Sequence, residues 1–121
     1  MTIRAIPFEA IARYKNADKN LAFCKNTDYF GLYDSGVFVG FAGLLLYPNK
    51  AVDKNIYVLP DYRGNGYFKA WLDWRAEYLK RNGINKIEAT CTAMSLREYL
   101  KRGAVVVKRY RLYTKVSHEN I

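Results

Sequence analysis

The sequence contains few cysteines, one histidine and no long apolar run. Its two cysteines, Cys24 and Cys91, have no metal-binding or redox spacing, which is typical of proteins from a reducing compartment. The single histidine, His118, lies in a segment, 117–121, that we expect to be a frayed tail. A nucleophilic triad built on histidine is therefore not expected, and no metal site is predicted.

The longest apolar run, Val37 to Tyr47, is shorter than the ~20 residues that a membrane-spanning helix needs. It contains two glycines and lies between Gly36 and Pro48, so it predicts a strand. The first ten residues also lack the pattern of a signal peptide. With 50% hydrophobic and 16% aromatic residues, the chain predicts one domain, residues 1–121, that is soluble and cytoplasmic and has no membrane partner.

Acidic residues are also scarce, with 11 Asp and Glu against 20 Lys and Arg, which gives a net charge of +9. The excess is uneven, because residues 1–60 have seven basic and five acidic residues whereas residues 61–121 have thirteen and six. This distribution favours a polyanionic partner, either a phosphorylated cofactor or a nucleic acid. The alternative is that the charge only keeps the protein soluble.

The spacing of apolar residues predicts a mixed α/β (α+β) fold. The predicted strands are Thr2–Ile6, Tyr29–Tyr33, Val37–Leu46, Val52–Val58, Lys86–Thr92, Ala104–Lys108 and Arg111–Val116. The predicted helices are a short one beginning at Pro7, Lys19–Lys25, a long one from Tyr67 to Arg81, and Leu96–Arg102 with Ser95 as its N-cap. Three strands between residues 29 and 58 are expected to form an antiparallel meander, followed by one crossover helix. The result is a mostly antiparallel twisted sheet flanked by helices.

The most informative stretch, Asn55 to Arg81, predicts a strand, a tight turn and the long helix. Pro60 ends the strand, and the turn Arg63-Gly64-Asn65-Gly66 follows. The apolar stripe of the helix consists of Phe68, Trp71, Leu72, Ala76 and Leu79. A flexible turn at a helix N-terminus exposes several N–H groups, and the helix dipole favours an anion there. The stretch therefore predicts a phosphate-binding site.

Three segments of the sequence resemble the GNAT superfamily of N-acetyltransferases and occur in the same order. The run Val58–Gly66, VLPDYRGNG, is similar to the family's V-x-P-x-[YWF]-R-G-x-G turn. The run Val37–Ala42, VFVGFA, resembles the end of the family's second and third strands. The run Tyr99–Gly103, YLKRG, resembles a late Y-x-x-x-G, where a short helix precedes a strand. The resemblance covers residues 29–116 and implies a GNAT-like fold.

The resemblance implies an acyl-CoA cofactor, most often acetyl-CoA, whose acyl group passes to a primary amine by direct attack. It places the pyrophosphate on the N–H groups of Arg63 to Phe68 and the pantetheine arm along the strand after Ile56. The N–H of Val58 or Leu59 would polarise the thioester carbonyl. The implied cofactor-binding residues are Tyr57, Val58, Leu59, Arg63, Gly64, Asn65, Gly66, Tyr67 and Phe68. Phe68 replaces a small residue of the family, so its side chain is expected to point into the core.

The same resemblance implies three catalytic candidates. Asp53 is the nearest match to the family's strand acid and is expected to share a strand face with Asn55 and Tyr57. Glu88 is the other candidate base. Tyr99 would protonate the departing CoA thiolate, since a phenol stays protonated at neutral pH. The alternatives are a solvated Asp53 and a Glu88 that pairs with a neighbouring Lys or Arg.

The identity of the acceptor stays open between a small polyamine-like molecule, a protein amine and a nucleic-acid amine. The run 108–115, KRYRLYTK, favours the last, because Arg109, Arg111 and Tyr113 would share one face of a strand. A different hypothesis is a catalytically inactive GNAT-fold module that binds nucleic acid or protein. A weaker one is another phosphate-binding protein that shares only the turn. Either a monomer or a homodimer is compatible with the sequence.

Overall fold

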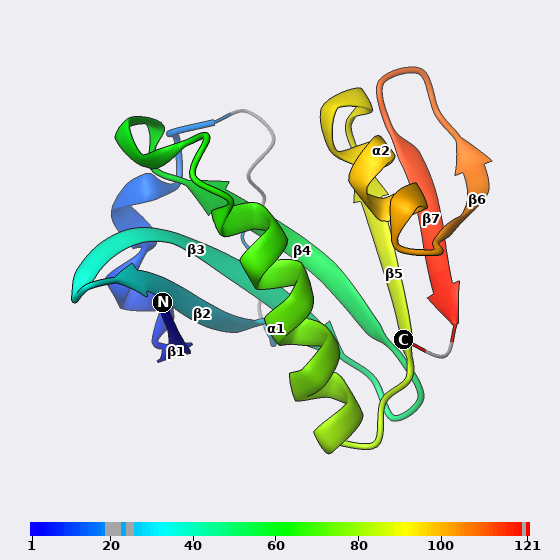
Figure 1. The fold of residues 1–121 in the computed structure, drawn as a ribbon, viewed down its shortest axis with the longest axis horizontal. Coiled ribbons are helices and arrows are strands. Elements are labelled where there is room, and N and C mark those ends of the chain that lie inside the picture. The colour runs from blue at the N-terminus through cyan, green and yellow to red at the C-terminus, as the bar shows by residue number, and fades with distance from the viewer. Residues whose placement is uncertain (19–22, 24–25, 120) are drawn as a thin grey trace.

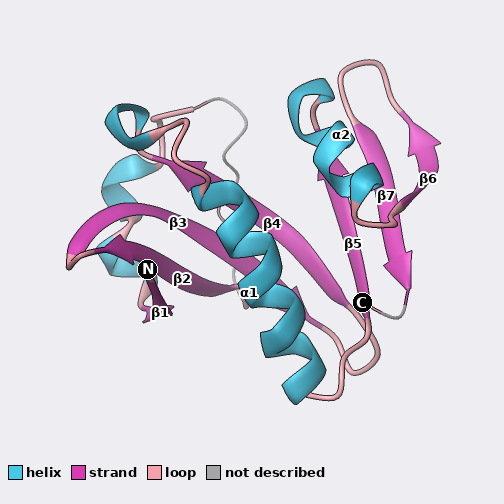
Figure 2. Ribbon diagram, viewed as in Figure 1, coloured by secondary structure: helices cyan, strands magenta, loops and turns pink. Residues whose placement is uncertain are grey.

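The computed structural model describes residues 1–18, 23, 26–119 and 121, and these residues form a single seven-stranded sheet (Figure 1, Figure 2). The strands are β1 Thr2–Ile6, β2 Asp28–Asp34, β3 Val37–Leu46, β4 Ala51–Val58, β5 Lys86–Cys91, β6 Val105–Arg109 and β7 Thr114–Glu119. The helices are α1 Tyr67–Arg81 and α2 Ala93–Lys101, with short 3-10 turns η1 Phe8–Ala10, η2 Ala12–Tyr14 and η3 Pro60–Tyr62. Both α-helices cover the same face of the sheet (Figure 1). The predicted mixed, mostly antiparallel sheet with flanking helices is confirmed.

Strands β1 to β4 form an antiparallel meander, as the sequence predicts for residues 29–58. The β2–β3 hairpin closes at Ser35 and Gly36, which both have positive φ angles of 51° and 81°. This pair of left-handed residues matches the twist of the flanking strands. The meander therefore forms a stable half-sheet onto which the rest of the chain is added.

Helix α1 then crosses over to β5, which lies parallel to β4. The two strands pair only at their beginnings, where Ala51, Val52 and Asp53 lie opposite Ile87, Glu88 and Ala89. Beyond Asp53 the strands diverge, and the gap between them is visible in Figure 1. The sheet therefore splits in its centre, between two antiparallel halves.

Each face of the sheet has its own core. Under α1 and α2 the fully buried side chains include Trp71, Leu72 and Leu79, which belong to the predicted apolar stripe of α1. On the opposite face, Ile11 from the segment between η1 and η2 packs with Tyr29, Phe41 and Tyr57. Since both faces are covered, β2 and β3 are largely apolar on both sides rather than alternating.

Several predicted boundaries are wrong near the ends of the chain. The helix expected from Pro7 is two 3-10 turns, and the helix expected over Lys19–Lys25 lies outside the described residues apart from position 23. Helix α2 begins three residues earlier than predicted, with Thr92 rather than Ser95 at its N-cap. Thr92 has extended backbone geometry, which suits an N-cap, whereas Ser95 already lies within the first helical turn.

The last strand is displaced towards the C-terminus by comparison with the prediction. It spans Thr114–Glu119 because Val116 is buried in the core and Ser117 is also buried. The tail expected at residues 117–121 is therefore largely a strand, and His118 belongs to the sheet. Arg111 lies in the turn between β6 and β7, so the expected strand face with Arg109, Arg111 and Tyr113 does not form. Among the described residues, no helix has the length and apolar character needed to cross a membrane.

The contact between β3 and β4 predicts an intolerance to substitution at Gly40. A Cβ atom there would lie 2.4 Å from the carbonyl oxygen of Tyr57, closer than real atoms approach. We expect Gly40→Ala to lower the free energy of unfolding by about 1–3 kcal/mol, because backbone must move. Urea denaturation measures this loss. Gly31→Ala is the matched control, since its Cβ would meet the movable ring of Tyr33, and equal losses in both variants would contradict the prediction.

Candidate active site

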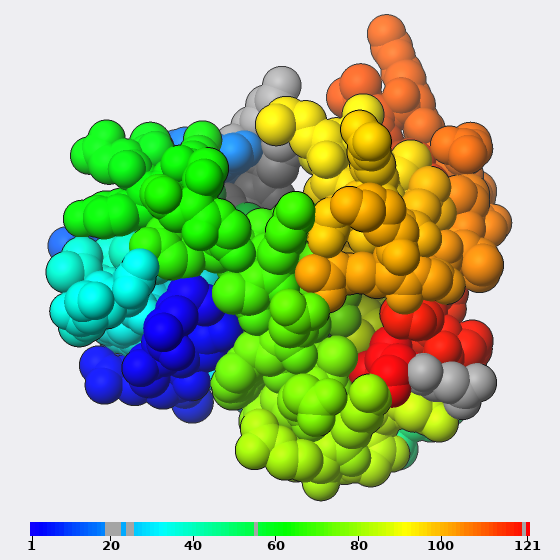
Figure 3. All heavy atoms as spheres, viewed as in Figure 1, coloured from blue at the N-terminus to red at the C-terminus, as the bar shows by residue number. Residues whose placement is uncertain are grey.

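A cleft of about 650 Å³ occupies the gap between the diverging strands β4 and β5. Its walls come from β4, from the turn before α1, and from the β5–α2 junction. The lining residues from these three segments include Asp53, Ile56, Val58, Arg63, Gly64, Gly66, Phe68, Cys91, Thr92, Ser95 and Tyr99. Figure 3 shows the surface hollowed between the turn that precedes α1 and the N-terminal end of α2. The cleft has the size of a typical ligand site.

The backbone of β4 forms one edge of the cleft. The N–H of Leu59 donates a hydrogen bond of 2.8 Å to the carbonyl of Val39 in β3. Because alternate residues of an antiparallel ladder point their backbone groups to opposite sides, those of Ile56 and Val58 point away from β3. Pairing with β5 has already ended at Asp53. The polar backbone groups of Ile56 and Val58 therefore line the cleft.

Arg63 occupies part of this edge. Its Nε donates a hydrogen bond of 2.9 Å to the Val58 carbonyl, and its guanidinium carbon lies 5.2 Å from the centre of the Tyr57 ring. The N–H of Val58 faces the cleft, whereas the N–H of Leu59 is used by β3. Of the two N–H groups predicted to polarise a thioester, the geometry favours that of Val58.

The turn at the mouth of the cleft is held open by two glycines. Gly64 and Gly66 have φ angles of 83° and 80°, and no atom lies within 4 Å of the position that a Cβ would take at either residue. The side chain of Asn65 closes the turn by donating a hydrogen bond of 2.9 Å to the Tyr62 carbonyl. The first intrahelical bond of α1 runs from Ala70 to Gly66. The N–H groups of the first turn are therefore directed at open space at the positive end of the helix.

Phe68 lies on the inner side of this turn. Its side chain is half-buried and contacts the ring of Tyr99 edge to face, with 6.0 Å between ring centres and 67° between ring planes. It therefore points towards α2 and the core, as expected, and not across the open side of the turn. The aromatic side chain fills the floor of the cleft and leaves the backbone N–H of Phe68 in the first turn of α1.

A buried ion pair lies at the inner end of the cleft. The Nε of Arg75 in α1 is 3.1 Å from Oδ2 of Asp53, and the two side chains are only 6% and 10% exposed. The same Oδ2 accepts a hydrogen bond of 3.3 Å from the Tyr99 hydroxyl. The Arg75–Asp53 contact is close but poorly aligned for a hydrogen bond, and among the described residues Oδ1 of Asp53 has no partner.

Burial controls the protonation of both acids in this group. Loss of water raises the pKa of Asp53, while the positive charge of Arg75 and the Tyr99 hydrogen bond oppose this shift. Burial also raises the pKa of Tyr99 well above its usual value, and the negative charge of Asp53 adds to the effect. The hydroxyl of Tyr99 is therefore protonated at neutral pH and points at a carboxylate that its neighbour Arg75 partly neutralises.

Comparisons with known proteins agree on one family. The family model described as the acetyltransferase (GNAT) family matches residues 4–104. The chain belongs to the GNAT family of acetyltransferases. No curated protein matches the sequence. The expectation drawn from the three similar segments, including that of an acetyltransferase, is confirmed.

Solved structures show the same fold at low sequence identity. The PaiA N-acetyltransferase of Thermoplasma acidophilum, in complex with coenzyme A, has a TM-score of 0.69 and 18% identity, with 92% of this chain and 67% of that chain covered. An IAA acetyltransferase of Bacillus cereus has a TM-score of 0.75 and 19% identity, covering 98% of both chains. Mutant forms of the spermidine/spermine N-acetyltransferase SpeG of Vibrio cholerae have a TM-score of 0.81 and 14% identity, covering 98% and 93%.

The strand acid expected in this GNAT protein, Asp53, does not share a strand face with Tyr57. A bulge in the β3–β4 ladder, between Gly43 opposite Asn55 and Leu44 opposite Asp53, inserts one extra residue into β4. Asp53 therefore faces Arg75 and Tyr99, whereas Tyr57 packs in the core of the opposite face. The expectation that Asp53 and Tyr57 share one face is wrong, because strict alternation does not hold across a bulge.

Glu88 is not brought to the cleft. Its carboxylate accepts a hydrogen bond of 2.9 Å from Lys50 and lies 3.9 Å from Lys115. The Lys50 hydrogen bond lowers the pKa of Glu88, with Lys115 and Lys86 adding to the effect. Its neighbours Ile87 and Ala89 are buried under the helices, so Glu88 points to the opposite face of β5. The structure shows the lysine pairing that the sequence left as the alternative.

Arg75 is the site residue that the sequence prediction missed. It lies on the apolar stripe of α1, four residues after Trp71 and four before Leu79, and is 5% exposed. A charged residue at such a position needs a buried countercharge. This pattern was available in the sequence, but only the fold shows that Asp53 is the partner.

The buried ion pair predicts a large effect of Asp53→Asn on stability. The substitution keeps the shape of the side chain but leaves Arg75 buried without a countercharge, so we expect a loss of about 3–5 kcal/mol in the free energy of unfolding. Urea denaturation at neutral pH measures it. The double variant Asp53→Leu/Arg75→Met should recover most of the loss, and Glu88→Gln, whose partner Lys50 is more exposed, should lose less. If Asp53→Asn lost as little stability as Glu88→Gln, Asp53 and Arg75 would not be energetically coupled.

Proposed function

We propose that this protein transfers an acyl group, most often acetyl, from an acyl-CoA to a primary amine by direct attack. The proposal rests on one observation, that a single cleft joins the free backbone edge of β4, the open glycine turn of α1 and the hydroxyl of Tyr99. The family assignment supports it, and so does the similar fold of a protein solved with coenzyme A.

The residues of the cleft fit a CoA molecule. The N–H groups of Gly64 to Phe68 and the positive end of α1 would hold the pyrophosphate, with the charge of Lys69 beside them. The backbone groups of Ile56 would pair with the amides of the pantetheine arm, since the Val58 carbonyl already accepts a hydrogen bond from Arg63. When bound, an acyl-CoA supplies an activated thioester. The Val58 N–H then stabilises negative charge that develops on the thioester oxygen.

Tyr99 acts on the leaving group. As the amine nitrogen forms its bond to the acyl carbon, the bond between carbon and sulfur breaks and negative charge develops on sulfur. The Tyr99 hydroxyl is protonated and is held by Asp53 only through a long hydrogen bond of 3.3 Å, so it can turn and donate its proton to sulfur. The amine loses a proton in the same reaction, and this proton returns to the Tyr99 oxygen through water.

Asp53 and Arg75 position Tyr99 in this proposal. Asp53 is buried and already pairs with Arg75, which makes it a poor base for an amine that arrives from solvent. Its carboxyl group instead keeps the Tyr99 hydroxyl at the inner end of the cleft, and the charge of Arg75 opposes the rise in the pKa of Asp53 that burial causes. Glu88 faces the opposite side of β5 and contributes through its lysine pairs only.

The basic end of the molecule favours a nucleic-acid amine as acceptor. This basic end consists of exposed side chains on α2, on β6 and in the turn between β6 and β7, namely Arg97, Lys101, Lys108, Arg109 and Arg111. Within the described part of the chain these five have no ion-pair partner. The exposed Tyr110, with Lys108 over its ring at 5.0 Å, adds an aromatic surface. The same surface would serve an inactive nucleic-acid-binding module.

Substitution of Tyr99 tests the enzymatic proposal. We expect Tyr99→Phe to bind acetyl-CoA with similar affinity in calorimetry but to lose about 100-fold in kcat, because the proton donor is removed. Thiol release with a panel of primary amines, including spermidine and an aminated oligonucleotide, measures turnover. Tyr47→Phe, at an exposed position, is the control. No binding of acetyl-CoA by the unchanged protein, or full turnover by Tyr99→Phe, would contradict the proposal.

The basic end predicts salt-dependent binding to nucleic acid. Affinity for a fluorescent oligonucleotide should fall steeply between ~50 and ~200 mM salt, since released counterions drive binding. The double variant Lys108→Glu/Arg109→Glu in β6 should weaken oligonucleotide binding far more than the matched double variant Lys80→Glu/Arg81→Glu in the last turn of α1. Fluorescence anisotropy gives both results. Equal weakening by the two pairs would mean that net charge alone acts, and affinity that does not change with salt would exclude a phosphate-binding surface.

A further inference from the structure

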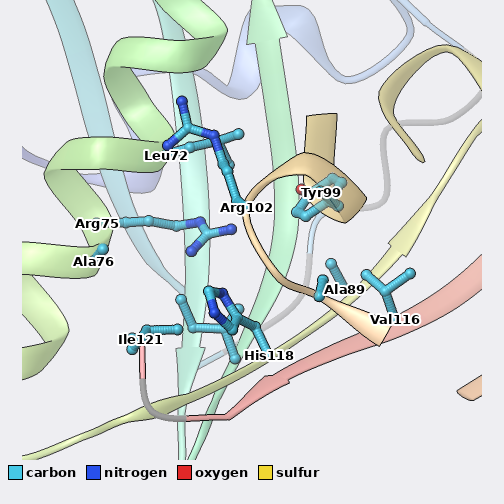
Figure 4. A pocket seen from close by; sticks show the side chains of 11 residues that line it. Leu72, Arg75, Ala76, Ala89, Tyr99, Arg102, Val116, His118 and Ile121 are labelled. Atoms are coloured by element: carbon cyan, nitrogen blue, oxygen red, sulfur yellow. The ribbon is translucent and has the colours of Figure 1, made fainter. Parts of the chain in front are cut away.

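A second cavity, of about 240 Å³, lies between α1, α2 and the strands β5 and β7, and Tyr99 is part of its wall (Figure 4). Tyr99 and Arg75 both line it, so the Asp53–Arg75–Tyr99 group separates the cavity from the cleft. Most of its wall is apolar, with Leu72 and Ala76 from α1 facing Ile87 and Val116 from the sheet. Neither the family assignment nor the proposed acyl transfer uses this cavity.

Arg75 contributes unused hydrogen-bond donors to the cavity. A guanidinium group has five N–H donors in a planar fork. Only its Nε has an ion-pair partner, Asp53, and among the described residues no group accepts a hydrogen bond from its two terminal nitrogens. The side chain extends from α1 into the cavity, where the guanidinium lies beside the ring of His118 (Figure 4). Because Arg75 is 5% exposed, an anion inside the cavity can accept hydrogen bonds from these donors with little competition from water.

The other polar groups of the wall limit what this acceptor can be. Arg102 is already bound by Asp73 at 2.5 Å and by Glu98 at 3.0 Å. Burial and the nearby charges of Arg75 and Lys80 lower the pKa of His118, so its ring is neutral at pH 7. Among the described cations of the wall, Arg75 has one carboxylate partner, Asp53, whereas Arg102 has two, so the charge of Arg75 is the less neutralised of the two. A singly charged anion fits this balance better than a phosphate dianion.

We propose that this cavity binds a short-chain aliphatic monocarboxylate. The planar fork of Arg75 matches the two oxygens of a carboxylate, which is the geometry of strong bidentate pairs. The aliphatic tail would lie on Leu72, Ala76, Ile87 and Val116, where it is removed from water. The apolar wall explains why the ligand is a carboxylate with a tail and not a hydrated inorganic ion.

An occupied cavity would also affect Tyr99, a consequence that rests on the proposed acyl transfer. A carboxylate on the terminal nitrogens competes with Asp53 for the charge of Arg75. Asp53, with less support from Arg75, takes up a proton more readily and accepts a weaker hydrogen bond from Tyr99. The carboxylate therefore regulates transfer from this second cavity, without entering the cofactor site.

Nuclear magnetic resonance tests the binding itself. The Nε–H signal of Arg75 and the ring signals of His118 are followed in ¹⁵N-labelled protein during a titration with sodium butyrate. We expect a saturable shift of both, and none with butylammonium chloride or with sodium chloride at equal ionic strength. The shift should persist when the cleft is saturated with CoA. No saturable shift, an equal response to butylammonium, or loss of the shift on addition of CoA would overturn the proposal.

A variant that fills the cavity provides the second test. Ala76→Leu adds three carbon atoms to the apolar wall while Arg75, Asp53 and Tyr99 keep their identity, and it should abolish the butyrate shift. Ala5→Leu, on the exposed edge strand β1, is the matched control and should bind butyrate as the unchanged protein does. Equal butyrate binding by Ala76→Leu and the control would overturn the assignment to this cavity. Since no acyl-CoA is turned over, these outcomes are separate from those that test the acyl transfer.

Discussion

The buried ion pair between Asp53 and Arg75 is the constraint on which the site depends. Asp53 is the last residue of β4 that pairs with β5, so the carboxylate lies where the two strands begin to diverge. Arg75 extends from the crossover helix to this point and links α1 to the fork of the sheet. An unpaired charge here would cost several kcal/mol, which explains why helix, strand and fork are positioned together. The cleft on one side and the cavity on the other both begin at this pair.

The bulge in β4 makes this arrangement compatible with a two-sided core. Before the bulge, Ala51 and Asp53 face the helices, and after it Ile56 does so while Tyr57 packs on the opposite face. Without the extra residue, either the face of β4 under the helices or the aromatic core on the far side would lose its residues. The same strand therefore supplies a charged group at the fork, an apolar side chain to each core, and free backbone groups along the cleft.

Local patterns in the sequence predicted the strand, turn and helix that form the candidate site, but not which side chains these elements bring together. The strand, turn and helix from Ala51 to Arg81 follow from β-branched residues, paired glycines and a period of 3.6, and the resemblance selected Tyr99. The bulge could not be predicted, since it depends on how β3 and β4 pair. The ion pair between Arg75 and Asp53 depends on how helix α1 crosses over the sheet. The position of β7 depends on the burial of Val116 against residues that are distant in sequence. Such long-range contacts override local pattern.

Phe68 shows how a departure from the family pattern is accommodated by a neighbouring residue. A bulky residue in the glycine turn would block an anion if its side chain pointed outwards, but here it packs against Tyr99. The Tyr99 ring is therefore enclosed by Phe68 on the side of the cleft and by Arg75, whose guanidinium carbon is 5.8 Å from the ring centre, on the other. A small residue at position 68 would leave this ring free to tilt. The turn thus combines two features, because its backbone N–H groups face the mouth of the cleft while the Phe68 side chain holds the orientation of the Tyr99 ring.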